Sequence, residues 1–385
     1  MNETLAQTED AGAWTEKDAR AARKFCFLFV LLVAAALSAI ATANYLVNPH
    51  GQYATRWIDP MVQTSRAEKI HLLQAYENAP EALVLGSSRS MKYEPDYLES
   101  KLGLRFFNAG VNYAKPEDWL ALTKFYQERF ETFPKMIVIA MDIHSMTNGE
   151  PPDARLLVQP ELAKHVSHLV SSGDLWRPWG SLIGWNQTKS TFKSLKRQLL
   201  PPESSGPIES FRSDGFLRYH QREAQISEGV YDFEGPLEYN KNEYLHYYNR
   251  YAGVSDVRKK ALGEIIASCG ANDCELLVFL TPLHPRLADY LREFGDFEAR
   301  KADVQILMNQ LSSKHGFMFR DYSDVASFGG DPSEFVDGIH PLESNTRLVI
   351  DQMLSERHLP EHEPASSNVR IDRQQAGKES HYAVQ

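Results

Sequence analysis

The chain has little cysteine and fewer basic than acidic residues. Three cysteines among 385 residues cannot build a disulfide framework or a four-cysteine zinc site. Lysine and arginine number 41 against 51 aspartates and glutamates, which gives a formal net charge of −10. This acidic balance argues against a nucleic-acid partner, because binding a phosphate backbone requires clustered cations. Glycine (22) and proline (20) are too few for a collagen-like or linker-dominated chain.

Long hydrophobic runs are also lacking, with one exception. Residues 25–47 read FCFLFVLLVAAALSAIATANYLV and carry no charge, and about 20 such residues suffice for a helix to cross a bilayer. The flank after this run holds only Arg56, whereas four cations precede it: Lys17, Arg20, Arg23 and Lys24. The positive-inside rule therefore predicts a cytoplasmic leader (1–24), a single transmembrane anchor (25–47) and an extracytoplasmic body.

Two features that bear on this segment and its compartment stay open. Ala41-Thr42-Ala43 fits the cleavage pattern of a secretory signal, although the long leader favours an uncleaved anchor. Both readings leave the body in the same compartment. In such an oxidising compartment Cys269 and Cys274 either form a local disulfide or remain free thiols.

The body alternates short apolar runs with amphipathic stretches after a connector (48–80). Five runs have the pattern of buried strands: 82–85, 105–108, 136–141, 276–280 and 317–320. Helical patterns lie between them, at 95–102, 116–130, 256–267, 285–294, 297–314 and 343–356. Strands separated by helices imply a parallel sheet that is covered on both faces. We therefore predict an α/β fold, a flavodoxin-like three-layer sandwich with about five central strands, formed by residues 81–149 and 254–358.

The periodicity weakens between these two parts. Residues 150–253 are rich in Pro, Ser, Trp and Tyr, and we predict an insertion with a few helices that forms a cap over the site. Its tryptophans are either buried or dip into a bilayer interface: Trp176, Trp179 and Trp185. The aromatic stretch 244–251 either stacks on sugar rings or packs a helix on the sheet. The polar residues 359–385 predict a flexible tail.

Residues with useful chemistry follow the predicted strands. Ser88 comes just after the first strand, Gly110 just after the second, and Asp337 and His340 in the loop after the last. In open parallel sheets ligands bind beyond the carboxyl ends of the strands, so we expect these side chains to converge at one edge.

This set of residues suits nucleophilic catalysis. A serine hydroxyl becomes a nucleophile when a histidine takes its proton and an acid orients that histidine. Ser88, His340 and Asp337 supply these three groups, and backbone N–H groups beside glycine can bind an oxyanion. Alone, a Gly-Ser-Ser segment is often only a helix cap. The spacing of a zinc protease (HExxH) is absent, and we predict neither a metal nor a cofactor.

Three segments together resemble the SGNH (GDSL-like) hydrolase superfamily: VLGSSRS (84–90), FNAG (107–110) and DGIHP (337–341). The resemblance covers residues 81–145 and 256–356, and it looks closest to a membrane-anchored branch that acylates or deacylates bacterial cell-envelope polymers. Accessory proteins of teichoic-acid D-alanylation and alginate acetylation belong there. The resemblance implies Ser88 as nucleophile, His340 as base, Asp337 as acid and Gly110 as an oxyanion donor.

The resemblance also implies where the protein acts and on what. It places the anchor in the inner (cytoplasmic) membrane and the body in the periplasm. The implied partners are a cell-envelope polysaccharide or its acyl donor, and a membrane-bound O-acyltransferase.

The sequence departs from the family pattern in two places. Ser87 stands where many relatives have Asp, and Asp142 follows the third strand where relatives have an oxyanion-binding Asn. A carboxylate would repel an oxyanion, so either Asp142 points elsewhere or another donor serves, Asn112 being the nearest. Arg89 either binds a substrate carboxylate or phosphate, or forms a structural ion pair.

These observations predict an acyltransferase or esterase that acts on O-acyl groups of polysaccharide. The alternative is a protein that keeps the SGNH fold, is catalytically impaired, and serves as a binding or scaffold partner of an O-acyltransferase or assembly complex.

Overall fold

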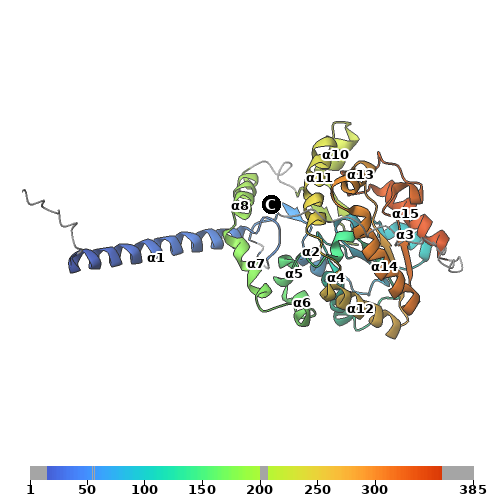
Figure 1. The fold of residues 1–385 in the computed structure, drawn as a ribbon, viewed down its shortest axis with the longest axis horizontal. Helices are drawn as coiled ribbons and strands as arrows, with labels where there is room; N and C mark the ends of the chain where they lie inside the picture. Colours follow the sequence, from blue (N-terminus) through green and yellow to red (C-terminus); the bar gives the residue numbers. More distant parts are fainter. Residues whose placement is uncertain (1–14, 54, 56, 200–206, 358–385) are drawn as a thin grey trace, which may run out of the picture.

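The computed structural model describes residues 15–53, 55, 57–199 and 207–357 (Figure 1). The predicted tail (359–385) and residues 1–14 of the predicted leader lie outside the described residues. Helix α1 (Glu16–Val47) projects away from the body in Figure 1 and has a mean hydropathy of 2.6 over its most apolar window. No part of that window is buried in the body. The predicted apolar helix is confirmed, and it is long and apolar enough to cross a membrane.

Five strands form one parallel sheet in the order β3–β2–β4–β7–β8. Their bounds are β2 (Ala82–Gly86), β3 (Phe106–Asn108), β4 (Met136–Met141), β7 (Glu275–Leu280) and β8 (Met318–Asp321). Every residue of β2 and β4 is buried, because both faces of the sheet are covered. The second strand in the chain lies at the edge beside the first, as in flavodoxin-like sheets. The predicted α/β class is confirmed.

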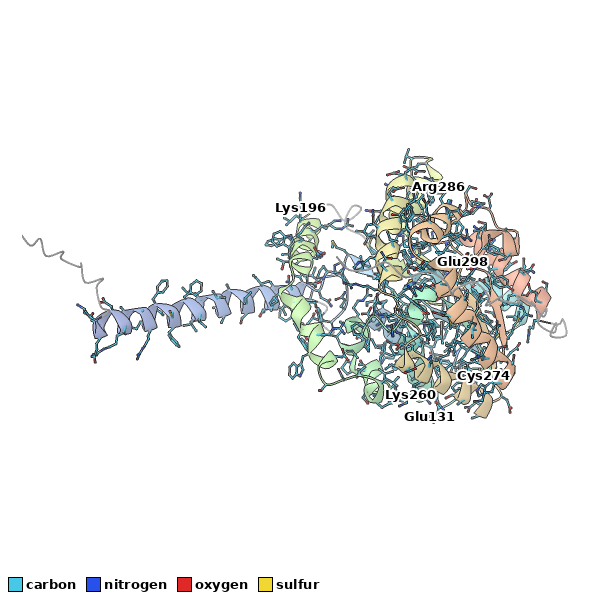
Figure 2. The ribbon with its side chains drawn as sticks, in the orientation of Figure 1. Glu131, Lys196, Lys260, Cys274, Arg286 and Glu298 are labelled. Atoms are coloured by element: carbon cyan, nitrogen blue, oxygen red, sulfur yellow. The ribbon has the colours of Figure 1, made fainter. Side chains whose placement is uncertain are left out.

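Two hydrophobic clusters lie on opposite faces of this sheet, because successive residues of a strand point to opposite sides. One cluster packs Leu83, Ile137 and Val278 against α2 (Arg66–Ala75), α4 (Pro116–Phe130), α12 (Asp256–Ala271), α13 (Pro285–Phe294) and α14 (Phe297–His315). The other packs Val84, Val138 and Phe279 against α3 (Pro95–Leu102) and α15 (Glu343–Glu356). Side chains fill the space between these three layers (Figure 2).

A second, smaller sheet was not predicted. It contains β1 (Val62–Gln63), β5 (Glu209–Phe211) and β6 (Leu217–Arg218), so it joins the connector to the insertion. Strands of two or three residues are too short to show an alternating pattern in the sequence.

The insertion carries several helices, as predicted: α5 (Ala154–Leu157), α6 (Pro160–Ala163), α7 (Arg177–Gly180), α8 (Trp185–Gln198), α10 (His220–Ser227) and α11 (Glu234–Asn249). The aromatic stretch lies mainly on α11, where Tyr244 and Tyr248 pack into the core. Trp176 and Trp185 are 77% and 74% exposed, which excludes the buried alternative for both. Cys269 and Cys274 are buried free thiols (Cys274 is labelled in Figure 2).

Candidate active site

Ser88 follows a tight turn at the end of β2. The turn begins at Gly86, whose φ of +151° suits glycine. A Cβ there would meet the Ala140 carbonyl oxygen at 2.5 Å and the Ser90 Cβ at 2.7 Å. Ser87 then caps the short 3₁₀ helix η1 (Ser88–Ser90) by accepting from the Arg89 N–H. The turn places Ser88 at the carboxyl edge of the sheet with its side chain half-buried.

A chain of hydrogen bonds joins the three residues predicted to act together. His340 Nε2 lies 2.8 Å from Ser88 Oγ, and His340 Nδ1 lies 2.8 Å from Asp337 Oδ2. An imidazole protonated on Nδ1 donates to the carboxylate and accepts from the hydroxyl, which is the arrangement that lets histidine take the serine proton. The structure therefore brings these three side chains together from residues far apart in the sequence.

Asp337 is held in its ionised form. Burial raises the pKa of its carboxyl, but the charge and hydrogen bond of His340 and two backbone hydrogen bonds together lower it by more. The backbone N–H groups of Ile339 and His340 also donate to Asp337 Oδ1, at 2.9 and 3.0 Å. The pKa of Asp337 thus lies below its ordinary value, and a charged carboxylate stabilises a protonated His340.

A cavity of about 480 Å³ lies over these residues. One wall comes from the strand ends and carries Ser88, Asn112 and Asp142; the other comes from the insertion and includes Glu209, Tyr219, Arg222, Tyr239, Asn240 and Tyr244. Residues of the insertion therefore form part of the wall of this cavity.

Two insertion residues in the wall contact the loop that carries Asp337 and His340, and sequence reasoning missed both. Asn240 Oδ1 accepts from the Gly338 N–H at 2.9 Å, between Asp337 and His340. The Tyr219 ring meets the His340 ring edge-on, with centroids 6.3 Å apart. Both lie where the sequence has weak periodicity, and neither belongs to a motif.

The prediction that Gly110 binds an oxyanion differs from the structure. The Gly110 N–H donates to Asn108 Oδ1 at 3.0 Å, so it is already used. Glycine is required there for packing, because a Cβ would lie 2.1 Å from Ser90 Oγ. Two other donors remain at the cavity: the Ser88 N–H and the Asn112 side-chain amide have no hydrogen-bond partner among the described residues.

Arg89 and Asp142 form a buried pair beside the nucleophile candidate. Arg89 Nε lies 3.4 Å from Asp142 Oδ1, and Thr281 bridges them, accepting from Arg89 at 2.9 Å and donating to Asp142 at 2.7 Å. Burial raises the pKa of Asp142, but the Arg89 charge and further contacts lower it to below its ordinary value. The side chain of Arg89 is 3% exposed and lies beside the Asp142 carboxylate, which favours the structural ion pair over a substrate-binding role.

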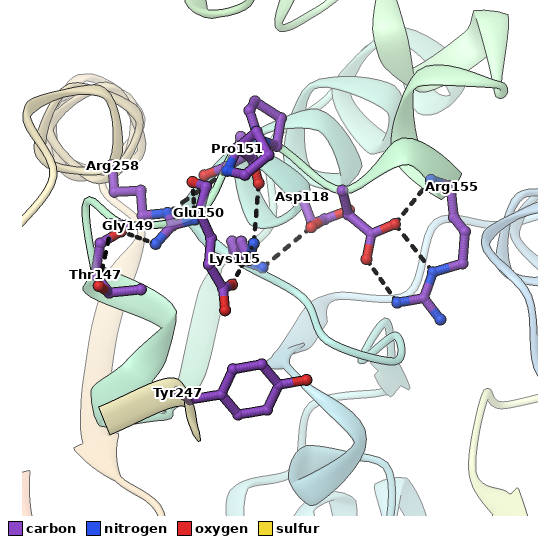
Figure 3. Close-up of polar contacts among 12 residues, drawn as sticks. Lys115, Asp118, Thr147, Gly149, Glu150, Pro151, Arg155, Tyr247 and Arg258 are labelled. Carbon is purple, nitrogen blue, oxygen red and sulfur yellow. Dashed lines mark hydrogen bonds and ion pairs between the residues drawn. The ribbon is translucent and has the colours of Figure 1, made fainter. Parts of the chain in front are cut away.

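A larger cavity, of about 920 Å³, adjoins the first and shares Tyr113, His144 and Arg155 with it. Its polar wall is held by internal pairs: Lys115 contacts Glu150 at 2.8 Å and donates to the Pro151 carbonyl at 3.0 Å. Figure 3 shows these contacts, with the Tyr247 ring set apart from them. Trp185 and Ser181 line the same cavity, so it extends from the wall that it shares with the first cavity toward α8.

His144 separates the two cavities and is buried as a neutral ring. It stacks on Tyr247 with centroids 5.4 Å apart and meets Tyr244 edge-on. Burial lowers the pKa of His144 from 6.5 to about 4, and the nearby Arg89 charge also lowers it.

This burial predicts a stability that depends on pH. The unfolded chain binds a proton on His144 below pH 6.5 and the folded chain only below about 4, so stability falls as the pH drops across that window. The loss is about 1.4 kcal/mol for each pH unit, or roughly 3 kcal/mol in all. We expect His144→Phe, which keeps a ring but binds no proton, to flatten this part of a urea-unfolding series against pH. An unchanged acid limb in that variant would contradict the assignment.

Among the described residues, no group of three or more His, Cys, Asp or Glu side chains is arranged to hold a metal ion.

The comparisons with known proteins add little to this geometry. A solved structure from Bacteroides fragilis NCTC 9343, described as that of a candidate acylhydrolase, aligns with a TM-score of 0.31 and 10% sequence identity. The alignment covers 75% of this chain and 92% of that one. So weak a likeness carries no argument about function. No family model and no curated protein matches the chain.

Proposed function

We propose that this chain is a membrane-anchored SGNH-like acyltransferase or esterase that acts on O-acyl groups of cell-envelope polysaccharide. The observation that carries the proposal is the hydrogen-bonded chain Ser88–His340–Asp337, which opens into a cavity at the carboxyl edge of a parallel sheet. The motifs around these residues support the SGNH assignment, and that resemblance is the source of the polysaccharide substrate.

The reaction begins when Ser88 Oγ attacks the ester carbonyl carbon while His340 Nε2 takes the hydroxyl proton. The carbon–oxygen bond to the leaving alcohol then breaks, and His340 returns the proton to that oxygen. Water or a sugar hydroxyl next attacks the acyl-serine and gives its proton to His340, which passes it to Ser88 Oγ as the acyl group leaves. Water gives ester hydrolysis, and a sugar hydroxyl gives acyl transfer.

The oxyanion of each step needs donors. We assign the Ser88 N–H and the Asn112 amide, since both border the cavity without a partner among the described residues. This assignment replaces Gly110, whose N–H is bound to Asn108. Removing one such donor typically costs about a hundredfold in rate.

We place the protein in the inner (cytoplasmic) membrane through α1, with the N-terminus in the cytoplasm and the body in the periplasm. The cations before the span and their scarcity after it support this orientation. A membrane-bound O-acyltransferase is the partner that the SGNH resemblance suggests.

A fluorophosphonate probe tests the nucleophile directly, because it reacts only with an activated serine. We expect the full-length protein in detergent to be labelled at Ser88 and Ser88→Ala to be unlabelled. Ser87→Ala is the matched control and should keep the label, since Ser87 caps η1 but does not contact His340. An unlabelled wild-type protein, or label that persists in Ser88→Ala, would overturn the proposal.

A binding or scaffold role is the second candidate, and the occupied N–H of Gly110 is the observation that favours it. It predicts that the protein binds glycan equally well with and without Ser88→Ala and that neither form is labelled. Binding together with labelling at Ser88 would exclude it.

A further inference from the structure

The segment from Trp176 to Leu199, which contains α7 and α8, exposes an unusual number of large apolar side chains. Their exposed fractions run from 48% to 87%, for Trp176, Trp179, Ile183, Trp185, Phe192 and Leu199. We call these six side chains the α7–α8 surface. Exposed apolar side chains gathered on one segment of a protein mark an interaction site.

Helix α8 departs from the usual pattern of a helix on a soluble body, which buries its apolar face and exposes its polar face. The residues it buries are polar: Gln187, Thr191 and Ser194. The apolar residues Trp185, Phe192 and Leu199 recur every seven residues, so they share one face, and that face is exposed. The helix therefore presents its apolar face outward.

This segment is fixed to the end of the predicted membrane span. The side chain of Asn44, in the last turn of α1, donates to the Leu182 carbonyl at 2.6 Å and to Thr188 Oγ1 at 3.0 Å. The Tyr53 hydroxyl lies 3.0 Å from Ser181 Oγ. Figure 1 shows α7 and α8 running across the direction of α1 at the point where α1 meets the body. A helix in this position lies along a bilayer surface when α1 crosses that bilayer.

Positive charge accompanies the apolar face. Lys189, Lys193 and Lys196 are exposed on the adjoining side of α8 and form no ion pair within the described ranges. Figure 2 shows Lys196 near the end of α8, on the side of the molecule from which α1 projects. A helix with tryptophan and phenylalanine on one side and lysine beside them is typical of segments that lie in the interface of an anionic membrane.

We propose that the α7–α8 surface docks on the outer face of the bilayer that α1 spans, with its aromatic residues among the lipid headgroups and its lysines on anionic lipid. The proposal rests on the membrane anchoring assigned to α1 above and is independent of the chemistry of Ser88. Its occupant is lipid rather than protein, because the surface continues directly from the span and combines interfacial aromatics with unpaired lysines.

Docking also orients the catalytic body. Ser181 and Trp185 line the 920 Å³ cavity that shares His144 with the cavity over Ser88. With the surface on the membrane, this larger cavity lies beside the headgroups, so a membrane-borne substrate reaches Ser88 without leaving the bilayer surface.

Depth-dependent quenching tests the proposal on the full-length chain. Single cysteines are introduced in a Cys26→Ser background as Phe192→Cys, Phe29→Cys in the span, and Ile306→Cys on α14. Position 306 is a matched control, since it is 57% exposed against 69% for Phe192. Each protein carries an environment-sensitive fluorophore and is reconstituted in vesicles of phosphatidylcholine with or without phosphatidylglycerol. Spin-labelled lipids serve as quenchers from the membrane and iodide as the quencher from water.

We expect lipid quenching at positions 29 and 192 and none at 306. Anionic lipid should increase the quenching at 192, and the change of Lys189, Lys193 and Lys196 to Gln should abolish that increase. Quenching at 29 with none at 192 would overturn the docking but leave the anchor intact. Protection of position 192 from both quenchers would show a protein occupant and also overturn it. Absence of quenching at 29 would overturn the anchor itself.

Discussion

Ser88→Ala and His340→Ala should each lower the hydrolysis of p-nitrophenyl acetate by about 10⁴-fold or more, because the two residues act as one unit. In the structure the Ser88 hydroxyl has His340 Nε2 as its acceptor, at 2.8 Å. Without the imidazole the hydroxyl keeps its proton, and without the hydroxyl there is no nucleophile. The double variant should therefore lose no more than either single variant. Initial rates of the full-length protein in detergent measure all three.

Asp337→Asn tests the orienting role of the acid. The amide can still accept from Ile339 and His340, so the loop should keep its shape. It can also donate to Nδ1, which favours the wrong tautomer of His340 and removes the charge that stabilises the imidazolium. We expect a loss of about 10⁴-fold in kcat. Ser87→Ala is the control, with a loss below about tenfold, since a capping bond contributes about 1 kcal/mol. Equal losses in both variants would indicate damage to the fold instead.

The sequence predicted the sheet well because its strands are buried on both faces. Residues 136–141 are uninterrupted apolar residues, and β4 has those bounds. Helices α4 and α13 begin at prolines, Pro116 and Pro285, and both were predicted with the bounds that the structure shows. The alternation of strands and helices implies a parallel sheet, and it shows which residues follow a strand and so lie at the carboxyl edge. The convergence of Ser88, Asp337 and His340 could therefore be predicted from this topology.

The rest of the site depends on contacts that no local pattern encodes. Whether the Gly110 N–H is free depends on the rotamer of Asn108, which turns back to accept from it. Asn240 reaches the loop that carries Asp337 and His340 from α11, in the insertion where the sequence has weak periodicity. The sequence left two roles open for Arg89, and the contacts among three strand ends favour the structural ion pair.

Asp142→Asn should destabilise the protein even though it introduces the residue that the resemblance to SGNH hydrolases leads one to expect at this position. Arg89 follows β2, Asp142 follows β4 and Thr281 follows β7, so their contacts tie together three neighbouring strand ends. Asparagine can still accept from Thr281, but the Arg89 guanidinium would lose the one buried carboxylate that pairs with it among the described residues. Breaking a buried pair by removing one charge costs about 3 kcal/mol or more. We expect that loss in the free energy of unfolding by urea, and a loss of activity because η1 carries both Arg89 and Ser88.

The double variant Arg89→Met with Asp142→Asn separates this explanation from a direct effect on the oxyanion. It removes both charges, and methionine can rest on the Tyr244 ring that Arg89 now covers at 4.9 Å. If the pair is structural, the double variant recovers most of the stability, with a coupling of about 1–3 kcal/mol between the two changes. If Asp142 instead repels a developing oxyanion, Asp142→Asn alone should hydrolyse p-nitrophenyl acetate faster than the wild type without losing stability. That result would show that the Asp142 carboxylate slows ester hydrolysis. It would favour a natural reaction in which Asp142 contacts a substrate group.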